Sequence, residues 1–168
     1  MSGLTKKLEV GANIAIILVA LLLGAVLIRR FLLAPAPPQM HQISAGTKVP
    51  IAGVDWGRNG KTLMLVLQKG CHFCSESAPF YQRLVRETSG QSGLAVMAVL
   101  PQTTDEAKQY LSELNVPVQD VRQAALGSLG VSGTPTLLLV DSQGAVLQAW
   151  VGKLPVEQEA EVLQKVRA

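Results

Sequence analysis

The sequence predicts an α/β domain in which a mixed sheet is flanked by helices, preceded by one N-terminal transmembrane helix. Three observations support this prediction. Residues 11–28 form an uncharged apolar stretch, apolar runs of strand length at residues 61–68 and 94–100 enclose a helical segment, and two further runs at residues 136–140 and 145–151 are separated by a tight turn. A strand-helix-strand unit followed by a hairpin gives a sheet with both parallel and antiparallel neighbours.

Composition divides the 168 residues into four segments. These are a short tail at residues 1–10, an anchor at 11–33, a proline-containing linker at 34–47 and a globular domain at 48–168. A segment of roughly 120 residues is long enough to build one core that folds by itself. We therefore expect a single domain carried on a tethered anchor.

The anchor prediction depends on residues 11–28, in which Asn13 is the only strongly polar side chain. A helix rises about 1.5 Å per residue, so this stretch nearly crosses a hydrocarbon core of about 30 Å, and residues 31–33 lengthen it. A cleaved signal peptide is the alternative, because residues 34–36 read Ala-Pro-Ala, but such peptides have a shorter apolar region. Retention as an anchor is the favoured interpretation.

The net charge of +3 comes from the tail and the anchor. From residue 47 onward the chain carries 11 basic and 11 acidic side chains, which balance. A nucleic-acid-binding module needs a clustered basic face, and this domain has no run of Lys or Arg. We therefore exclude nucleic acid as a partner. Basic residues flank both ends of the anchor, so charge alone does not orient it in the membrane.

The first half of the domain alternates strands and helices. The nearly continuous apolar run at residues 61–68 is typical of a central strand buried on both faces. Residues 71–88 have helical spacing, with Pro79 expected to kink that helix, and residues 94–100 form the second strand. Thr103 and Glu106 have the spacing of a capping box, which starts a helix that ends near residue 115.

The second half contains a short segment at residues 116–121, a helical turn at 122–129 and the hairpin. Pro155 suits the first position of a closing helix, whose early glutamates and late basic residues complement its dipole. Connections of these kinds place helices on both faces of the sheet.

The residues that carry chemistry are Gly70-Cys71-His72-Phe73-Cys74, directly after a buried strand and at the start of a helix. Free N–H groups at a helix N-terminus favour a thiolate and lower cysteine pKa values into a range of roughly 3.5–7.5. Cys71, nearer the helix start, is the expected nucleophile, and Cys74, one turn further on, is the expected resolving thiol. His72 either adds positive charge near the thiolate or faces solvent, and Phe73 either contacts a partner or covers Cys74.

Residues 48–168 contain several further motifs beside the Cys71–Cys74 segment: Pro79 five residues later, Gly133-Thr134-Pro135-Thr136 before an apolar strand, residues 141–144 and Trp150-Val151-Gly152. Together these motifs resemble the thioredoxin superfamily, and the anchor together with an extra helix is similar to its TlpA-like branch of bacterial thiol-disulfide oxidoreductases. The resemblance implies a cis bond between Thr134 and Pro135, which would pack against the cysteines and dock the backbone of a partner.

The resemblance also implies the biological role. A TlpA-like protein would sit in the bacterial inner membrane by a single span, with its catalytic domain facing the periplasm, and would exchange thiols and disulfides with protein substrates, needing no cofactor. The branch favours a reductant, supplied by an unidentified membrane or periplasmic redox partner, whereas a histidine after Cys71 favours an oxidant.

The chain departs from the family pattern in two places. The family has a tryptophan just before its cysteine pair, whereas Lys69-Gly70 stands here. The family also carries a buried acid six residues before the first cysteine, where this chain has Leu65. Glu76 and Asp55 are candidate substitutes, and the proton-transfer group stays unassigned.

Other functions fit the cysteines less well. Structural zinc needs about four ligands, and the chain has two cysteines and two histidines, so we expect no metal site of that kind. The alternative from another class is a periplasmic copper-binding metallochaperone of thioredoxin fold, because Cys71, His72 and Cys74 are soft ligands and Met40-His41 lies in the linker. A purely structural disulfide would close too small a loop to add much stability.

Overall fold

The computed structural model describes residue 11, residues 13–14, 16–24 and 43–167. The contacts divide the chain into two units, Met1–Gln39 and Met40–Ala168. In the first unit, residues 16–24 are helical. Over the described ranges, no helix is both long enough and apolar enough to cross a membrane. Parts of the expected anchor at residues 11–33, the tail at 1–10 and linker residues 34–42 lie outside the described residues, so the anchor stays a prediction.

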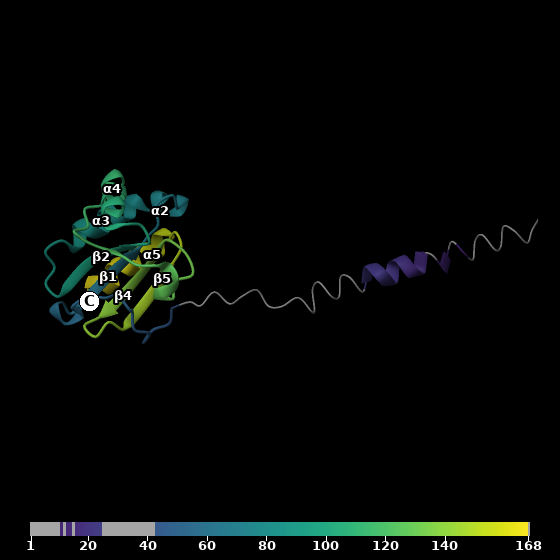
Figure 1. Cartoon of the computed structure of the whole chain (residues 1–168), viewed down its shortest axis with the longest axis horizontal. Helices are drawn as coiled ribbons and strands as arrows, with labels where there is room; N and C mark the ends of the chain where they lie inside the picture. The colour runs from purple at the N-terminus through teal and green to yellow at the C-terminus, as the bar shows by residue number, and fades with distance from the viewer. Residues whose placement is uncertain (1–10, 12, 15, 25–42, 168) are drawn as a thin grey trace, which may run out of the picture. The chain divides into compact units, whose positions relative to one another are not determined.

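The second unit is built on a five-stranded mixed sheet with the order β3-β2-β1-β4-β5 (Figure 1). Its strands are β1 (Lys61–Val66), β2 (Leu94–Leu100), β3 (Asp120–Gln123), β4 (Thr136–Asp141) and β5 (Val146–Val151). Strands β1, β2 and β3 are parallel neighbours, whereas β4 is antiparallel to both β1 and β5. The mixed sheet and the hairpin predicted from the sequence are therefore confirmed.

The α-helices cover one face of this sheet. They are α2 (His72–Glu76), α3 (Ala78–Thr88), α4 (Thr104–Glu113) and α5 (Val156–Arg167). Side chains of α3, α4 and α5 share one core cluster with Leu63 and Leu65 of β1 and with Leu67, which directly follows this strand. The connections β1-to-β2 and β2-to-β3 both step across the sheet in the same direction, and right-handed crossovers of that kind leave their helices on the same side.

The other face has no α-helix among the described residues. Met64 and Val66 of β1 pack there against Ile43 and Val49, which precede the sheet, and against η2 (Leu126–Leu129). The 3-10 helix η1 (Trp56–Arg58) contributes Trp56 to the same cluster. The sequence predicted helices on both faces of the sheet. Within the described residues, the second face is covered only by short 3-10 helices and by the segment that precedes the sheet. Ile43, the first described residue of this unit, already packs in this cluster, although it lies inside the expected linker.

The segment that was expected to be one helix over residues 71–88 is two helices, α2 and α3, which meet at Ser77. Pro79 lies at the start of α3, where its missing N–H breaks no helical hydrogen bond. Pro155 lies one residue before α5, and its carbonyl accepts hydrogen bonds from the main chain of Gln158 and Glu159. The prediction that Pro155 is the first helical residue is therefore wrong by one position.

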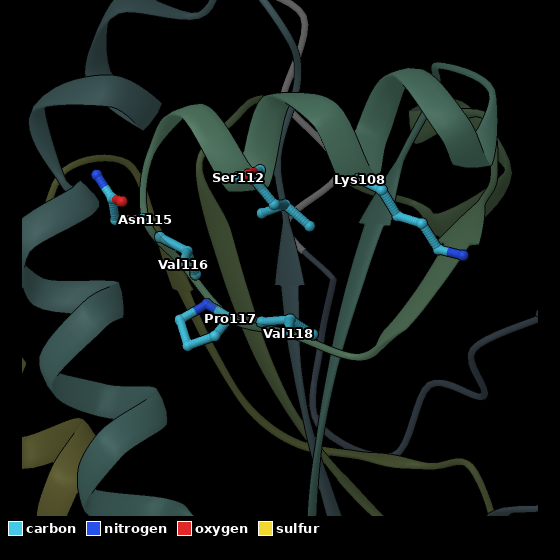
Figure 2. Close-up of a pocket in the computed structure, with 7 residues that line it drawn as sticks. Lys108, Ser112, Asn115, Val116, Pro117 and Val118 are labelled. Atoms are coloured by element: carbon cyan, nitrogen blue, oxygen red, sulfur yellow. The ribbon is translucent and has the colours of Figure 1, made fainter.

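The connection from β2 to β3 contains the predicted capping box, in which the Thr103 hydroxyl and the Glu106 carboxylate bond each other's main-chain N–H groups. Residues 120–123, assigned to a loop and a helical turn from the sequence, instead form strand β3. The loop after α4 borders a pocket of about 380 Å³ (Figure 2). Lys108, Ser112 and residues 115–118 line it, and it shares no residue with the cysteine pair.

Candidate active site

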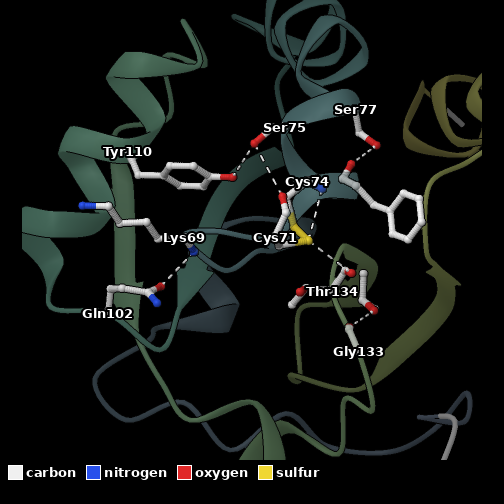
Figure 3. The surroundings of a disulfide bond; sticks show 11 residues. Lys69, Cys71, Cys74, Ser75, Ser77, Gln102, Tyr110, Gly133 and Thr134 are labelled. Carbon is white, nitrogen blue, oxygen red and sulfur yellow. Dashed lines mark hydrogen bonds between the residues drawn. A yellow bond between two sulfur atoms is a disulfide. The ribbon is translucent and has the colours of Figure 1, made fainter.

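Cys71 and Cys74 form a disulfide immediately after the central strand β1 (Figure 3). Gly70 has a φ of +82°, a conformation that L side chains rarely adopt, and it turns the chain from the strand into α2. Cys71 is the N-cap of α2, and its Sγ accepts a hydrogen bond of 3.2 Å from the main-chain N–H of Cys74. A Cys71 thiolate would accept the same bond, now assisted by charge.

The two cysteines differ in exposure. Cys74 is 0% exposed and belongs to the core cluster beneath the helices, whereas Cys71 is half-buried at its edge. A reagent or a partner protein can therefore reach Cys71 first. This asymmetry is the geometry expected of an attacking thiol at position 71 and a resolving thiol at position 74.

The loop before β4 lies directly beside Cys71. The Thr134-Pro135 peptide bond is cis, as the resemblance implies, and the carbonyl oxygen of Thr134 is 3.4 Å from the Cys71 Sγ (Figure 3). The Pro135 carbonyl accepts a hydrogen bond of 2.7 Å from the main-chain N–H of Gly152, after β5. The structure thus brings the Cys71–Cys74 pair next to the Thr134-Pro135 loop, although 63 residues separate Cys71 from Thr134.

The two residues between the cysteines face outward. The His72 side chain is 78% exposed, and its Nε2 lies 3.1 Å from the Glu76 carboxylate one helical turn away. Phe73 is 54% exposed, with its ring centroid 5.7 Å from that of His72. Of the two roles open to Phe73, its exposure agrees with a surface contact and not with a cover over Cys74.

Glu76 also binds Lys153, whose Nζ lies 2.9 Å from its second carboxylate oxygen. The hydrogen bond from Lys153 is the main cause that lowers the pKa of Glu76, and the neighbouring His72 lowers it further. The sequence analysis did not identify Lys153. No local signal could have found it, because 77 residues separate it from Glu76.

A second set of contacts ties α4 to the reactive turn, and these residues were also missed. The hydroxyls of Tyr110 and Ser75 are 3.4 Å apart, and the Ser75 hydroxyl lies 3.5 Å from the Cys71 carbonyl oxygen (Figure 3). The Gln102 side chain accepts a hydrogen bond of 3.3 Å from the main-chain N–H of Lys69. Helix α4 and the loop before it therefore contact the segments on the two sides of Gly70.

The two candidate proton acceptors, Asp55 and Glu76, do not lie at the buried position where the family carries an acid. Leu65 is fully buried, so the position where the family carries an acid is apolar. Asp55 caps η1 by accepting a hydrogen bond from the Gly57 N–H. It also lines a pocket with residues near the starts of β1 and β2. Cys71 follows the end of β1, so Asp55 and Cys71 lie at opposite ends of this strand. Glu76 contacts His72 and Lys153 at the surface. Neither carboxylate occupies the buried position of Leu65.

The described residues contain no group of three or more His, Cys, Asp or Glu side chains that could hold a metal ion. Met40 and His41, on which the copper alternative partly depends, lie outside the described residues. Within the described part of the chain, Cys71, Cys74 and His72 are the remaining soft ligands of that hypothesis, and the two sulfur atoms are bonded to each other.

Comparison with known proteins gives a consistent result. Residues 54–167 match the family model described as a thioredoxin-like domain. No curated protein matches the sequence. Among solved structures, the thioredoxin domain of a thiol-disulfide oxidoreductase from Bacteroides vulgatus is similar with a TM-score of 0.59 and 17% identity, over 76% of this chain and 100% of that chain.

Two further structures are similar over most of their length. A thiol:disulfide interchange protein from a Bacteroides species has a TM-score of 0.59 and 18% identity, over 75% of this chain and 92% of that chain. A structure described as a thiol:disulfide interchange protein, DsbE, from Chlorobium tepidum has a TM-score of 0.55 and 25% identity, over 74% of this chain and 96% of that chain.

Proposed function

The chain belongs to the family of thioredoxin-like domains, and from this premise we propose that it is a membrane-anchored reductant of protein disulfides that acts outside the cytoplasm. It is a thiol-disulfide oxidoreductase, and its redox-active pair is Cys71 and Cys74. The observation that carries the proposed mechanism is the half-buried Cys71 beside Thr134 and Pro135, with Cys74 buried behind it.

In the reducing direction, the Cys71 thiolate attacks one sulfur of a partner disulfide. A mixed disulfide forms, and the second partner sulfur leaves as a thiolate that takes up a proton. Cys74 then loses its proton and attacks the Cys71 sulfur, which releases the first partner sulfur. The partner gains two electrons and two protons, and Cys71 and Cys74 end as a disulfide. An upstream dithiol must reduce this disulfide before the next turnover.

The Thr134-Pro135 loop is the proposed docking point for the partner's main chain. Thr134 presents its carbonyl oxygen beside the Cys71 sulfur, and Pro135 has no N–H to compete for an incoming acceptor. A partner segment that lies along this loop would bring its disulfide to Cys71. Phe73, exposed next to the pair, offers an apolar contact to the same segment.

The proposed location rests on the N-terminal sequence. Residues 11–28 carry no charge, and the large side chains of residues 16–23 are apolar all around the helix, which suits a lipid environment. We propose a single span in the bacterial inner membrane with the domain in the periplasm, where protein disulfides persist. Alkaline extraction of membranes, and labelling of reduced cells with a membrane-impermeant maleimide, test the anchor and the side of the membrane.

The mechanism is tested by trapping in the full-length chain. The Cys74→Ser variant should accumulate mixed disulfides through Cys71, whereas the Cys71→Ser variant should not, as judged on non-reducing gels. Adducts that require Cys74 alone would contradict the assigned roles. The reduction potential of the full chain in detergent tests the direction: a value near about −270 mV agrees with a reductant, and one near about −120 mV would show an oxidant.

A further inference from the structure

Glu76, on the helix whose N-cap is Cys71, contacts two basic side chains, His72 and Lys153. One carboxylate oxygen lies 3.1 Å from the His72 Nε2 and the other lies 2.9 Å from the Lys153 Nζ. His72 and Glu76 are one turn apart on α2, whereas Lys153 comes from the loop between β5 and α5. Both oxygens of the carboxylate are therefore occupied, one by the His72 imidazole and one by the Lys153 ammonium.

The position of Lys153 connects this cluster to the proposed docking loop. Lys153 directly follows Gly152, whose N–H is bonded to the Pro135 carbonyl, and the next carbonyl back along the chain, that of Thr134, lies beside the Cys71 sulfur. Cys71 is the N-cap of the helix that carries Glu76, so Glu76 is connected to the Cys71 region both through α2 and through Lys153 and the Thr134-Pro135 loop. A substitution that changes the charge of Glu76 therefore changes the charge close to the reacting sulfur.

Lys69 is the other basic residue next to the reactive turn. Lys69 precedes Gly70, and its ammonium acts on Glu106 of α4 and contributes to lowering the pKa of that carboxyl. Within the described part of the chain, the ion pairs that involve α2 are those of Glu76 with His72 and with Lys153. His72 directly follows Cys71 in the chain, so the positive charge that it carries when protonated is the charge of this cluster nearest in sequence to the Cys71 thiolate.

We propose that Glu76 is a positioning residue of the redox site: its carboxylate binds the His72 imidazole on the exposed side of α2 and offsets the positive charge that a protonated His72 presents to the Cys71 thiolate. A positive charge near that sulfur stabilises the reduced form and makes the disulfide a stronger oxidant. Glu76 acts against this effect. The inference deepens the proposed function, on which it rests, because it resolves the opposing expectations from His72 and from the TlpA-like resemblance in favour of a reductant.

The equilibrium with glutathione measures this effect. One oxidised protein reacts with two glutathione thiols to give the protein dithiol and one glutathione disulfide, so atoms and electrons balance. For Glu76→Gln in the full-length chain, we expect the equilibrium constant to shift about threefold toward the dithiol, which is about 14 mV. Lys153→Gln should shift it the opposite way, since it removes the cation that competes with His72 for Glu76.

A double-mutant cycle separates action through His72 from direct repulsion of the thiolate by Glu76. In a His72→Ala background, the shift caused by Glu76→Gln should fall to half or less. A shift above half of the original value in that background, or no shift in the parent background, would overturn the proposal. Thermal unfolding of each variant confirms that it is folded, which an exposed Glu-to-Gln change should preserve.

Glu87→Gln is the matched control. Glu87 is also a helical glutamate in a surface ion pair, with Arg167, and it lies at the far end of α3 from the cysteines. Its substitution should leave the glutathione equilibrium unchanged. This test is independent of the tests of the proposed function. The double-mutant cycle can fail for Glu76 while trapping through Cys71 succeeds. Conversely, the absolute potential can exclude a reductant while the coupling between Glu76 and His72 persists.

Discussion

The Sγ of Cys71 lies 3.4 Å from the main-chain carbonyl oxygen of Thr134, although 63 residues separate them. The sheet explains this contact. Strands β1 and β4 are antiparallel neighbours, and Val66 at the end of β1 pairs with Thr136 at the start of β4. The segment that follows β1 and the segment that precedes β4 therefore meet at the same end of these two strands. The reacting sulfur and the proposed docking loop are juxtaposed by strand register, not by any local sequence signal.

The difference in exposure of the two cysteines predicts selective alkylation. In the reduced full-length chain, iodoacetamide should modify Cys71 at least about tenfold faster than Cys74, because only Cys71 is accessible and accepts an N–H bond as a thiolate. Mass spectrometry of the two cysteines after a brief pulse measures the ratio. In guanidinium chloride the two rates should become similar, and a ratio near one in the folded protein would contradict the assigned roles.

The contact between Gly144 and Trp56 predicts a destabilising substitution. Gly144 has a φ of +78°, and a Cβ there would lie 2.9 Å from the Trp56 Nε1. Gly144→Ala should therefore lower the free energy of unfolding by about 1–2 kcal/mol for the backbone conformation and by about 1–3 kcal/mol more for the clash. Urea denaturation followed by tryptophan fluorescence measures the loss.

Gly90 provides the matched control for that experiment. It has the same φ of +78°, and a Cβ at this position would have nothing within 4 Å of it. Gly90→Ala should show the backbone cost alone, about 1–2 kcal/mol. Equal losses for the two variants would mean that Trp56 moves aside without cost.

The capping box at the start of α4 predicts a second loss of stability. The Thr103 hydroxyl accepts the Glu106 N–H bond and also contacts the Glu106 carboxylate. Thr103→Ala should lower the free energy of unfolding by about 0.5–2 kcal/mol, measured by urea denaturation. Ser112→Ala, at an exposed position of the same helix, should change it by less than about 0.5 kcal/mol. A loss of the same size in both variants would argue against the cap.

The turn between β4 and β5 predicts a pH-dependent contribution to stability. The Asp141 carboxylate accepts main-chain N–H bonds of 2.9 Å from Ala145 and 2.8 Å from Gln143, and these bonds lower its pKa in the folded state. A lowered folded-state pKa stabilises the protein above the unfolded-state pKa, about 3.9. That contribution is lost as the pH falls through the folded-state pKa.

Asp141→Asn should therefore be less stable than the parent at pH 7, and the difference should shrink as the pH falls below about 4. Unfolding free energies across this range test the prediction. Ser142→Ala, in the same turn, should show no such pH-dependent difference. A gap that stayed constant down to about pH 2 would show that Asp141 does not act through its charge.

Two features of the fold were not predictable from the sequence. Strand β3 has only four residues, and Val121 is the only one of them that is buried, so it shows no alternating pattern. Its pairing with β2, from Met97 opposite Asp120 onward, makes it a strand. The position of α4 on the same face as α3 depends in turn on β3, because the place of β3 beside β2 sets the direction of the second crossover.

The candidate site was predictable in the same uneven way. Cys71 and Cys74 were identified from spacing and from their place after an apolar strand, and Thr134 and Pro135 from the family resemblance. The contacts of Glu76 with Lys153, and of Ser75 with Tyr110, were not foreseen. Their partners come from other elements, and nothing in the local sequence marks them.

The sequence by itself predicted strands at 61–68, 94–100, 136–140 and 145–151, the capped helix after Thr103 and the reactive cysteine pair, and the structure has these strands at 61–66, 94–100, 136–141 and 146–151. Hydrophobic periodicity, capping and the cysteine spacing are local properties that neighbouring residues express directly. Only the tertiary structure decided which face the α-helices cover and that Glu76 contacts both His72 and Lys153. These features depend on strand order and crossover direction, which join residues that are distant in the chain.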